Sequence, residues 1–321
     1  MIKKTLYFGN PAKLKLQLTQ LVIESAEPGS VSRSVPVEDI GLVIIDHSQI
    51  TITHGAINAM IGNNAAILFC DAHHLPNGLV LPYTTNHTFS EKTRFQLEAS
   101  EPLKKQLWKQ TVQAKIGNQI AVLKAMGKPV DNMKYWQSNV SSGDAENHEG
   151  RAAAYYWKTV FTDYDINPQA EADAAPAMVA EPLPPHFLRQ RYGDPPNNLL
   201  NYGYAVLRAI VARSLVASGC LPVLGIHHRN KYNHFCLADD IMEPYRPYVD
   251  RLVLHILAGA GMNFDGELTG DIKKVLLTIP VIDVNIDGSS SPLMVAMQRT
   301  TSSLMRCYEG EGRKILYPVI E

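Results

Sequence analysis

Within residues 227–251, the imidazole of one histidine and the carboxyl groups of three acids are candidates for site chemistry. His228 supplies the imidazole, and the carboxyl groups belong to Asp239, Asp240 and Glu243. Residues three apart share a face of a helix, so Asp240 and Glu243 would present their carboxylates together. Carboxylate oxygens with one imidazole nitrogen suit Mg²⁺ or Mn²⁺ better than Zn²⁺. The stretch therefore predicts a site for a hard divalent cation.

Pro244 indicates where the helix that carries these acids begins. Proline has no backbone N–H and is tolerated in the first turn of a helix, so we expect the helix to start just before Pro244. The preceding turn would then deliver His228 to the carboxylates. Arg229, Lys231 and Arg246 are interleaved with the acids and are candidates for binding phosphates on either side of the site.

Glu149 is a further acid at an expected helix start. Asp144 and Asn147 precede it and supply capping chemistry. A carboxylate at this position ordinarily complements the helix dipole, and that reading stays open for Glu149. If Glu149, His228 and Glu243 converge, they form a small metal site, and such a metal neutralises phosphate charge and acts as a Lewis acid. Phosphoryl transfer needs little beyond that and in-line positioning.

Lysines are concentrated in residues 101–134, which contain only two acids, Glu101 and Asp131. For any single lysine, a solvated helix face is the ordinary interpretation. The excess of positive charge as a whole favours a track for a polyanion such as DNA. The lysines of this segment are Lys104, Lys105, Lys109, Lys115, Lys124, Lys128 and Lys134, and the first three are our candidates for DNA binding.

The length, composition and net charge of the chain limit the class of protein. A chain of 321 residues favours two domains, and 45% hydrophobic residues are enough for a substantial core. The net charge of −1 excludes a polycationic protein, so nucleic-acid binding must come from a local patch. The scattered cysteines are typical of reduced thiols in the cytosol. Those cysteines are Cys70, Cys220, Cys236 and Cys307.

Nothing in the sequence predicts an association with a membrane. The N-terminal residues MIKKTLYFGN lack the apolar core of a signal peptide. The longest apolar run, residues 204–226, contains Arg208 and Arg213 and predicts a buried helix rather than a membrane span. We expect a cytoplasmic protein.

Hydrophobic periodicity predicts an α+β fold, with a small N-terminal β-sheet domain followed by a larger all-α-helical domain. We expect residues 1–83 to form the β-rich domain, 84–90 a linker and 91–321 the helical domain. The acidic, proline-rich residues 162–191 are expected to be a flexible insertion. The expected elements are one half-buried strand over 13–23, central strands over 41–46 and 65–70, and helices over 54–62, 103–126 and 198–219.

Three runs carry a resemblance to a known family: NHEGRAAAYYW, NYGYAVLRAIVARSL and GIHHRNKYNHFCLADDIMEPYRPYVD, in this order. They resemble the CRISPR adaptation integrase family, in the branch found with single-effector RNA-guided nucleases (type II). The resemblance extends to the N-terminal runs IGLVIID and AAILFCDAHHLPNGLVLPY and so covers most of the chain.

The resemblance implies a metal-dependent DNA endonuclease and integrase that acquires CRISPR spacers. Such an enzyme joins the 3′-hydroxyl ends of short duplex DNA to the CRISPR repeat by transesterification. The resemblance assigns the metal, Mg²⁺ or Mn²⁺, to Glu149, His228 and Glu243, with Asp240 as an assisting catalytic residue. It gives no role to the insertion.

The resemblance also implies partners. The chain is expected to form a homodimer through its β-rich domain. Two such dimers are expected to clamp a small dimeric partner, the second universal CRISPR adaptation protein, in a heterohexamer that binds duplex DNA. The RNA-guided effector nuclease is a further candidate partner.

Two other interpretations compete with the integrase. One is a zinc site, although the spacing fits no standard zinc pattern. Its candidate ligands are His227, His228, His234 and Cys236. The other is a DNA-binding scaffold without chemistry, in which the acids pair with cations. Those cations are Arg229, Arg246 and Arg251.

Overall fold

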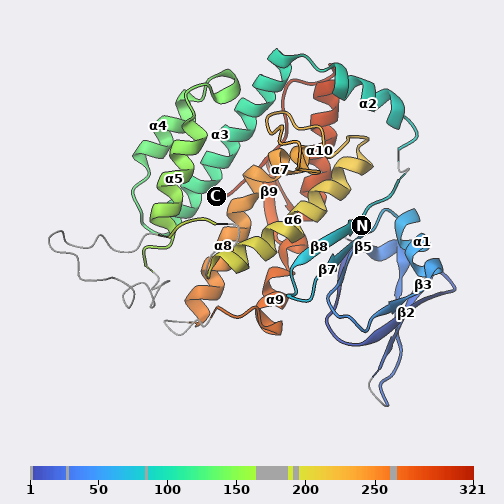
Figure 1. Cartoon of the computed structure of the whole chain (residues 1–321). Helices are drawn as coiled ribbons and strands as arrows, with labels where there is room; N and C mark the ends of the chain where they lie inside the picture. The colour runs from blue at the N-terminus through green and yellow to red at the C-terminus, as the bar shows by residue number, and fades with distance from the viewer. Residues whose placement is uncertain (1–2, 27–28, 84–85, 164–186, 191–194, 261–265) are drawn as a thin grey trace.

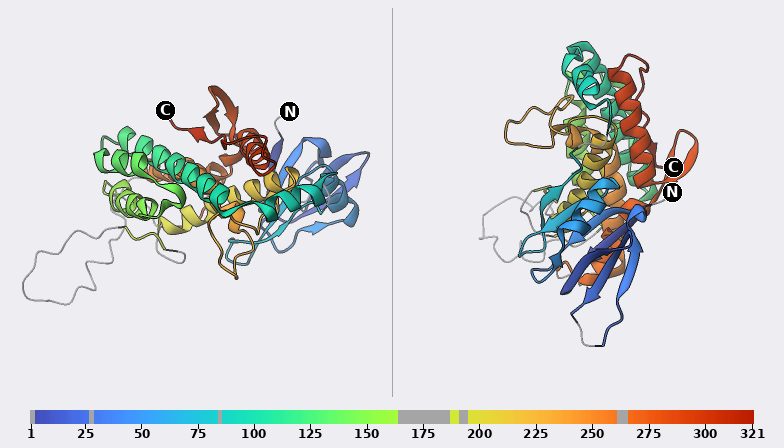
Figure 2. Two further views of the ribbon diagram at one scale, coloured as in Figure 1. Left: turned by 90° about the horizontal axis from the view of Figure 1, so that it is seen from above. Right: turned by 90° about the vertical axis from the view of Figure 1, so that its right-hand side faces the viewer.

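The structure is a computed structural model that describes residues 3–26, 29–83, 86–163, 187–190, 195–260 and 266–321 (Figure 1). The N-terminal strands gather at one end of the molecule, and a larger, mostly helical part forms the rest (Figures 1 and 2). The predicted α+β fold class is confirmed, but the part expected to be all-α-helical also contains a small antiparallel sheet formed by residues 283–286, 289–292 and 318–319. Among the described residues, no helix is long and apolar enough to cross a membrane.

The N-terminal part contains two four-stranded sheets. Their strand orders are β1-β5-β7-β8 and β4-β3-β2-β6. In the first sheet β1, β5 and β7 run parallel, and β8 is antiparallel to β7. The elements are β1 (Lys4–Phe8), β2 (Ala12–Gln17), β3 (Gln20–Ser25), β4 (Arg33–Pro36), η1 (Val37–Asp39), β5 (Ile40–Ile45), β6 (Thr51–Ile52), α1 (His54–Gly62), β7 (Ala66–Cys70) and β8 (Pro76–Val80).

Strand β5 joins the two parts of the molecule because it is buried on both faces. Val43 and Ile45 pack in a core with the second sheet and α1. Leu42 and Ile44 pack in the core of the helical part. A strand covered on both sides needs a continuous apolar run, which is why IGLVII lacks alternation.

The expectation of one strand over residues 13–23 is wrong. The segment forms an antiparallel hairpin of β2 and β3. Leu18 and Thr19 make the turn with φ angles of 47° and 62°. The core-facing positions change from an even number in β2 (Leu14) to odd numbers in β3 (Leu21 and Ile23), because Leu14 pairs with Ile23 across the hairpin. In the sequence this change appears as two adjacent polar residues, Thr19 and Gln20, which do not by themselves reveal a reversal of the chain.

The helical part encloses α6, whose residues are almost all buried. Helices α7, α8 and α10 pack against it. The predicted buried helix over 198–219 is confirmed. The elements are α2 (Phe89–Glu98), α3 (Glu101–Ala125), α4 (Asp131–Asn139), η2 (Ser142–Asp144), α5 (His148–Val160), α6 (Asn197–Ala217), α7 (Cys236–Met242), η3 (Glu243–Tyr245), α8 (Arg246–Ala260), α9 (Gly270–Leu276), η5 (Ile279–Val281), β9 (Asp283–Ile286), β10 (Ser289–Pro292), α10 (Leu293–Tyr308) and β11 (Pro318–Val319).

Two predicted boundaries lie partly outside the described residues. Residues 164–186 and 191 make up most of the predicted insertion and are not described. Helix α2 begins within the predicted linker, of which residues 84–85 are not described. The division into 1–83, 84–90 and 91–321 stays a prediction.

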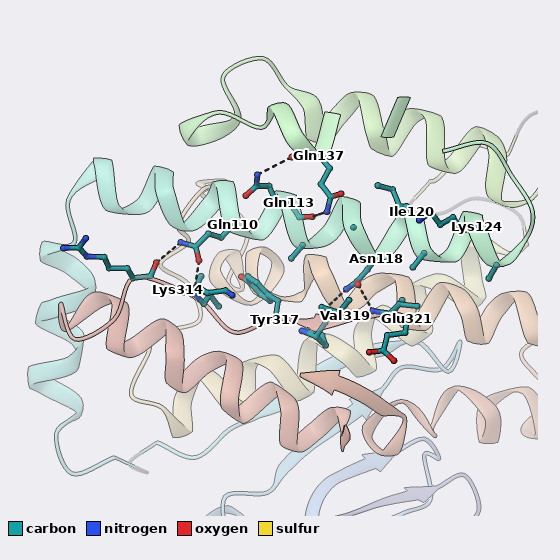
Figure 3. Close-up of a pocket in the computed structure, with 18 residues that line it drawn as sticks. Gln110, Gln113, Asn118, Ile120, Lys124, Gln137, Lys314, Tyr317, Val319 and Glu321 are labelled. Atoms are coloured by element: carbon teal, nitrogen blue, oxygen red, sulfur yellow. Dashed lines mark hydrogen bonds between the residues drawn. The ribbon is translucent and has the colours of Figure 1, made fainter. Parts of the chain in front are cut away.

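The C-terminal segment is fixed to α3 by two amide side chains (Figure 3). Gln110 donates to the carbonyl oxygen of Arg313 and accepts from the N–H of Ile315. Asn118 donates to the carbonyl oxygens of Pro244 and Pro318, at 2.7 and 3.0 Å. A cavity of about 1070 Å³ lies between α3 and this segment. Because Pro244 follows Glu243 directly, Asn118 also holds the backbone that carries this predicted ligand.

Candidate functional site

Glu149 stands in the first turn of α5, where a dense set of caps fixes the backbone. The carboxylate of Asp144 accepts the N–H groups of His148 and Glu149, each at 2.9 Å. Asn147, in a left-handed conformation, accepts the N–H of Gly150 at 3.2 Å. Amides at a helix start have no partners within the helix, and these side chains satisfy three of them. The predicted capping role of Asp144 and Asn147 is confirmed.

His228 lies in the loop between α6 and α7, and the buried Asp240 orients it. Asp240 Oδ1 lies 2.5 Å from His228 Nδ1. The same carboxylate accepts the N–H groups of His227 and His228, at 2.9 and 3.3 Å. The hydrogen bond between the His228 ring and the Asp240 carboxylate raises the pKa of His228. The negative charge of Glu243 raises this pKa further. Because the carboxylate engages Nδ1–H, the Nε2 atom is left as the potential metal ligand.

Glu243 begins the 3₁₀ turn η3, and the expected start of the helix just before Pro244 is only partly correct. Helix α7 already carries Asp240, and Pro244 stands at the start of η3. The two carboxylates consequently have different neighbours. Asp240 binds the histidine loop, whereas Glu243 forms ion pairs with Lys115 and Arg246.

The ammonium group of Lys115 lies between Glu149 and Glu243. Nζ is 2.6 Å from Glu243 Oε2 and also donates a short hydrogen bond to Glu149 Oε1. The side chains of Lys115 and Glu243 are only 10% and 6% exposed, and that of Glu149 is 27% exposed. The contact with Glu243 lacks hydrogen-bond geometry, so Glu243 Oε2 is buried without a donor.

Burial opposes ionisation within this cluster, but the opposite charges outweigh it. Burial favours the neutral form of Glu243, yet Arg246 and Lys115 lower the pKa of Glu243 to about 2. Burial likewise favours neutral Lys115, but Glu243 and Glu149 raise the pKa of Lys115. The pKa shifts of Glu243 and Lys115 therefore both favour the charged forms of these two groups.

Arg246 contacts the site from the other side of Glu243. Its Nη2 lies 3.1 Å from Glu243 Oε1, and its guanidinium stacks on the ring of Tyr204, 5.0 Å from the centroid. The hydroxyl of Tyr204 donates to buried Asp250. The DNA role of Arg246 stays a prediction. The scaffold alternative is right that Arg246 pairs with one of the acids.

The other predicted DNA-binding cations lie at or near the surface. Arg229 forms an ion pair with Glu101 at 2.6 Å, and Lys104 approaches the same carboxylate at 3.5 Å. Lys231 lies 4.9 Å from the ring centroid of Tyr232. Two further candidates on α3 are the exposed Lys105 and the half-buried Lys109.

Among the described residues, no three His, Cys, Asp or Glu side chains form a group ready to hold a metal ion. The donor chemistry nevertheless fits Mg²⁺ or Mn²⁺. The carboxylates of Glu149 and Glu243 already share the ammonium group of Lys115. Glu243 Oε2 is buried without a hydrogen-bond donor. A hard cation prefers such oxygen atoms, and His228 Nε2 would add one nitrogen.

The zinc alternative finds no support in the position of Cys236. Its thiol contacts the carbonyl oxygens of Asn230 and Asn233, at 3.6 and 3.4 Å. A zinc ligand would be a thiolate directed at a shared metal.

Two contributors to the site, Lys115 and Trp108, were not predicted from the sequence. Lys115 was counted only with the other lysines of its segment, whereas its ammonium holds both carboxylates. Trp108 stacks on His227 with ring centroids 4.1 Å apart and an interplanar angle of 1°. Trp108 and Lys115 are seven residues apart on α3 and share its buried face. A lysine in register with buried residues was the available signal.

Comparison with known proteins identifies the family. Residues 6–279 match the family described as CRISPR associated protein Cas1. The chain belongs to the Cas1 family. The CRISPR-associated endonuclease Cas1 of Neisseria meningitidis serogroup C (strain 8013) is 35% identical over 306 residues, which cover 94% of this chain and 91% of that relative. A Cas1 endonuclease of Pyrobaculum aerophilum is 27% identical and covers 78% of this chain and 81% of its own length.

Solved structures show the same fold in other members and in a casposase. A casposase bound to integration product superposes with a TM-score of 0.74 at 20% identity, covering 97% of this chain and 92% of that one. A Cas1 protein from Thermotoga maritima has a TM-score of 0.70 at 17% identity, covering 96% and 98%. A chain of a Cas6-RT-Cas1–Cas2 complex has a TM-score of 0.70 at 17% identity, covering 98% of this Cas1 family member and 36% of that chain.

These comparisons confirm the family expected from the three sequence runs and the α+β fold. The curated relatives are named CRISPR-associated endonucleases, in agreement with a nuclease or integrase activity for this Cas1 family member. The metal, the individual roles of the site residues and the DNA reaction stay predictions.

Proposed function

We propose that this Cas1 family member is a Mg²⁺- or Mn²⁺-dependent DNA integrase of CRISPR spacer acquisition. Its reaction would join the 3′-hydroxyl ends of short duplex DNA to the CRISPR repeat by transesterification, an exchange of one phosphodiester for another that needs no ATP. The single observation that carries the proposal is the convergence of Glu149 and Glu243 on the ammonium group of Lys115. This pair of carboxylates is accompanied by His228, whose ring the buried Asp240 orients.

The proposal gives each side chain a distinct task. Glu149 and Glu243 supply carboxylate oxygens, and His228 supplies Nε2. Asp240 is a positioning residue that fixes the ring of His228 through Nδ1. A divalent cation held there supplies charge neutralisation and Lewis acidity at the reacting phosphate. Arg246 keeps Glu243 ionised and in place.

DNA would be bound by the surface cations near the site. Arg229, Lys231, Lys104, Lys105 and Lys109 are the proposed phosphate contacts, because backbone contacts position a duplex without reading its sequence. The proposed assembly has two homodimers of this chain around a dimeric Cas2-type protein. The resemblance in fold to a chain of a Cas1–Cas2 complex supports such a partner.

The test is a strand-transfer assay with the purified chain, its Cas2-type partner, short duplex DNA and a plasmid bearing the repeat. We expect joined products with Mg²⁺ or Mn²⁺ and none with a chelator. Duplexes with 3′-dideoxy ends should give no product, because they lack the attacking hydroxyl. Joining without a divalent cation would overturn the proposal.

Variants separate chemistry from DNA binding. We expect Glu149→Gln, His228→Ala and Glu243→Gln to lower strand transfer by at least about 100-fold, because each removes a proposed ligand. A gel-shift assay should show DNA binding within about threefold of wild type, since phosphate contacts dominate affinity. Equal losses in both assays would contradict the assignment of these residues to the chemical step.

A further inference from the structure

Lys115 has an unusual position for a lysine on a long helix. Lys115 is only 8% exposed, and its ammonium contacts two carboxylates that come from α5 and η3. Both carboxylates are proposed metal ligands. The ammonium group of Lys115 therefore occupies the position between them where the metal ion would bind.

We propose that Lys115 is the resident counter-ion of the metal-free site and that a divalent cation binds by displacing its ammonium from between Glu149 and Glu243. This inference rests on the proposed function, because it assumes that the same two carboxylates bind the metal. It assigns Lys115 a role in metal affinity and in the stability of the metal-free protein.

The charges of the cluster favour displacement over simple addition. Glu149 and Glu243 carry two negative charges, and Lys115 and Arg246 carry two positive charges. A divalent ion added beside both cations would be repelled by each of them at short range. Removal of one ammonium lowers that repulsion and frees the oxygen atoms it occupies, including the otherwise unpartnered Glu243 Oε2.

The structure also distinguishes which cation leaves. The guanidinium of Arg246 is held between Glu243 and the ring of Tyr204, and Tyr204 is in turn hydrogen-bonded to Asp250. Lys115 reaches the carboxylates through a flexible four-carbon stem and acts as a compact point charge. The lysine can withdraw by rotation of its side chain, whereas Arg246 would have to break a stacked contact.

The first test measures Mn²⁺ affinity by titration calorimetry without DNA. Lys115→Met keeps the length of the side chain and removes its charge. We expect Mn²⁺ to bind this variant at least about tenfold more tightly than wild type, because the competing cation is gone. Lys124→Met is the matched control, since Lys124 is exposed on the same helix, and its affinity should equal that of wild type.

Thermal unfolding gives a second result for the same variant. Without metal, Lys115→Met should melt below wild type, because two close carboxylates lose their shared counter-ion. Saturating Mn²⁺ should raise its melting temperature by more than it raises that of wild type. A metal-free variant as stable as wild type would contradict the counter-ion role.

A third measurement uses only the wild-type chain and so does not depend on how the variant folds. Acetic anhydride labels accessible amines, and mass spectrometry reads the extent at each lysine. Lys115 should be poorly labelled without metal and several-fold more reactive with Mn²⁺, while Lys124 should not change. Unchanged labelling of Lys115 in a chain that binds Mn²⁺ would overturn displacement.

The outcomes separate this inference from the proposed function. If wild type binds no Mn²⁺, or if Glu149→Gln binds it as well as wild type, the metal site itself fails. If wild type binds Mn²⁺ through Glu149 but Lys115→Met binds it no more tightly, only the displacement fails.

Discussion

Lys273 Nζ lies 2.8 Å from Asp46 Oδ2, in an ion pair that joins α9 of the helical part to the end of β5. The two side chains are 5% and 0% exposed. Tyr7 also donates to this carboxylate at 2.6 Å, and the ring of His74 contacts it at 2.8 Å. The buried charge of Asp46 therefore depends on partners from both parts of the molecule.

Lys273→Met should destabilise the protein by about 3–5 kcal/mol, because it leaves a buried carboxylate without its cation. The neighbouring Lys274 is a matched control, since its side chain is 75% exposed and pairs only with exposed Asp271 among the contacts described. Lys274→Met should change stability by less than about 0.5 kcal/mol. Urea unfolding measures both, and equal stabilities of the two variants would contradict the importance of this ion pair.

Asp250 should make stability depend on pH. Burial raises the pKa of Asp250 from 3.8 to about 6, against the opposing effect of hydrogen bonds from Tyr204 and Tyr156. The folded state thus binds a proton more readily than the unfolded state. The stabilisation from the protonated form is complete below about pH 4 and is lost as the pH rises through about 6.

Asp250→Asn removes this titration. The free energy of unfolding of the variant minus that of wild type should rise by about 3 kcal/mol between about pH 4 and about pH 6, and then level off. Urea unfolding at a series of pH values measures this difference. A difference that stays constant, or one that falls as the pH rises, would show that Asp250 ionises freely in the folded protein.

Asp240→Asn tests the orientation of His228. An amide cannot accept hydrogen bonds on both of its arms, so one contact with the histidine loop is lost. We expect strand transfer to fall about 10- to 100-fold, as for other residues that orient metal ligands, with little change in DNA binding. Asp239→Asn is the comparison, because Asp239 pairs with Arg208 instead of the histidine ring. A larger loss for Asp239→Asn than for Asp240→Asn would contradict the assignment.

Gly225 is required by the close packing of the histidine loop. A Cβ atom at this position would lie 2.4 Å from the carbonyl oxygen of His228 and 2.9 Å from Asp240 Oδ2. Gly225→Ala should therefore displace the loop and lower strand transfer by about tenfold or more. Gly259→Ala meets open space on α8 and should instead stabilise the protein by up to about 1 kcal/mol. Wild-type strand transfer by Gly225→Ala would show that the loop accommodates the methyl group.

Local chemistry explains which elements were predictable from the sequence. Helix α1 has the predicted bounds because Thr53 caps its start and Asn63 ends it, and both signals lie next to the helix. The apolar runs of β5 and β7 were also recognisable as central strands. The hairpin of β2 and β3 was not recognisable, since its turn is marked in the sequence by no more than a one-residue shift of the alternation at Thr19 and Gln20.

The candidate site was only partly predictable for a different reason. Glu149, Glu243 and His228 were identified from their segments and from the resemblance. The place of Lys115 depends on α3 passing between α5 and η3, which is a tertiary relationship. The different orientations of Asp240 and Glu243 likewise follow from the change from α7 to η3 between them.

The central claim is that Glu149, His228 and Glu243 hold one divalent cation. Anomalous X-ray diffraction at the manganese absorption edge, from crystals of the chain grown with Mn²⁺, locates the ion directly. We predict one Mn²⁺ at roughly 2.0–2.3 Å from a carboxylate oxygen of each glutamate and from His228 Nε2. Manganese bound elsewhere, or none at a concentration that supports strand transfer, would contradict the account.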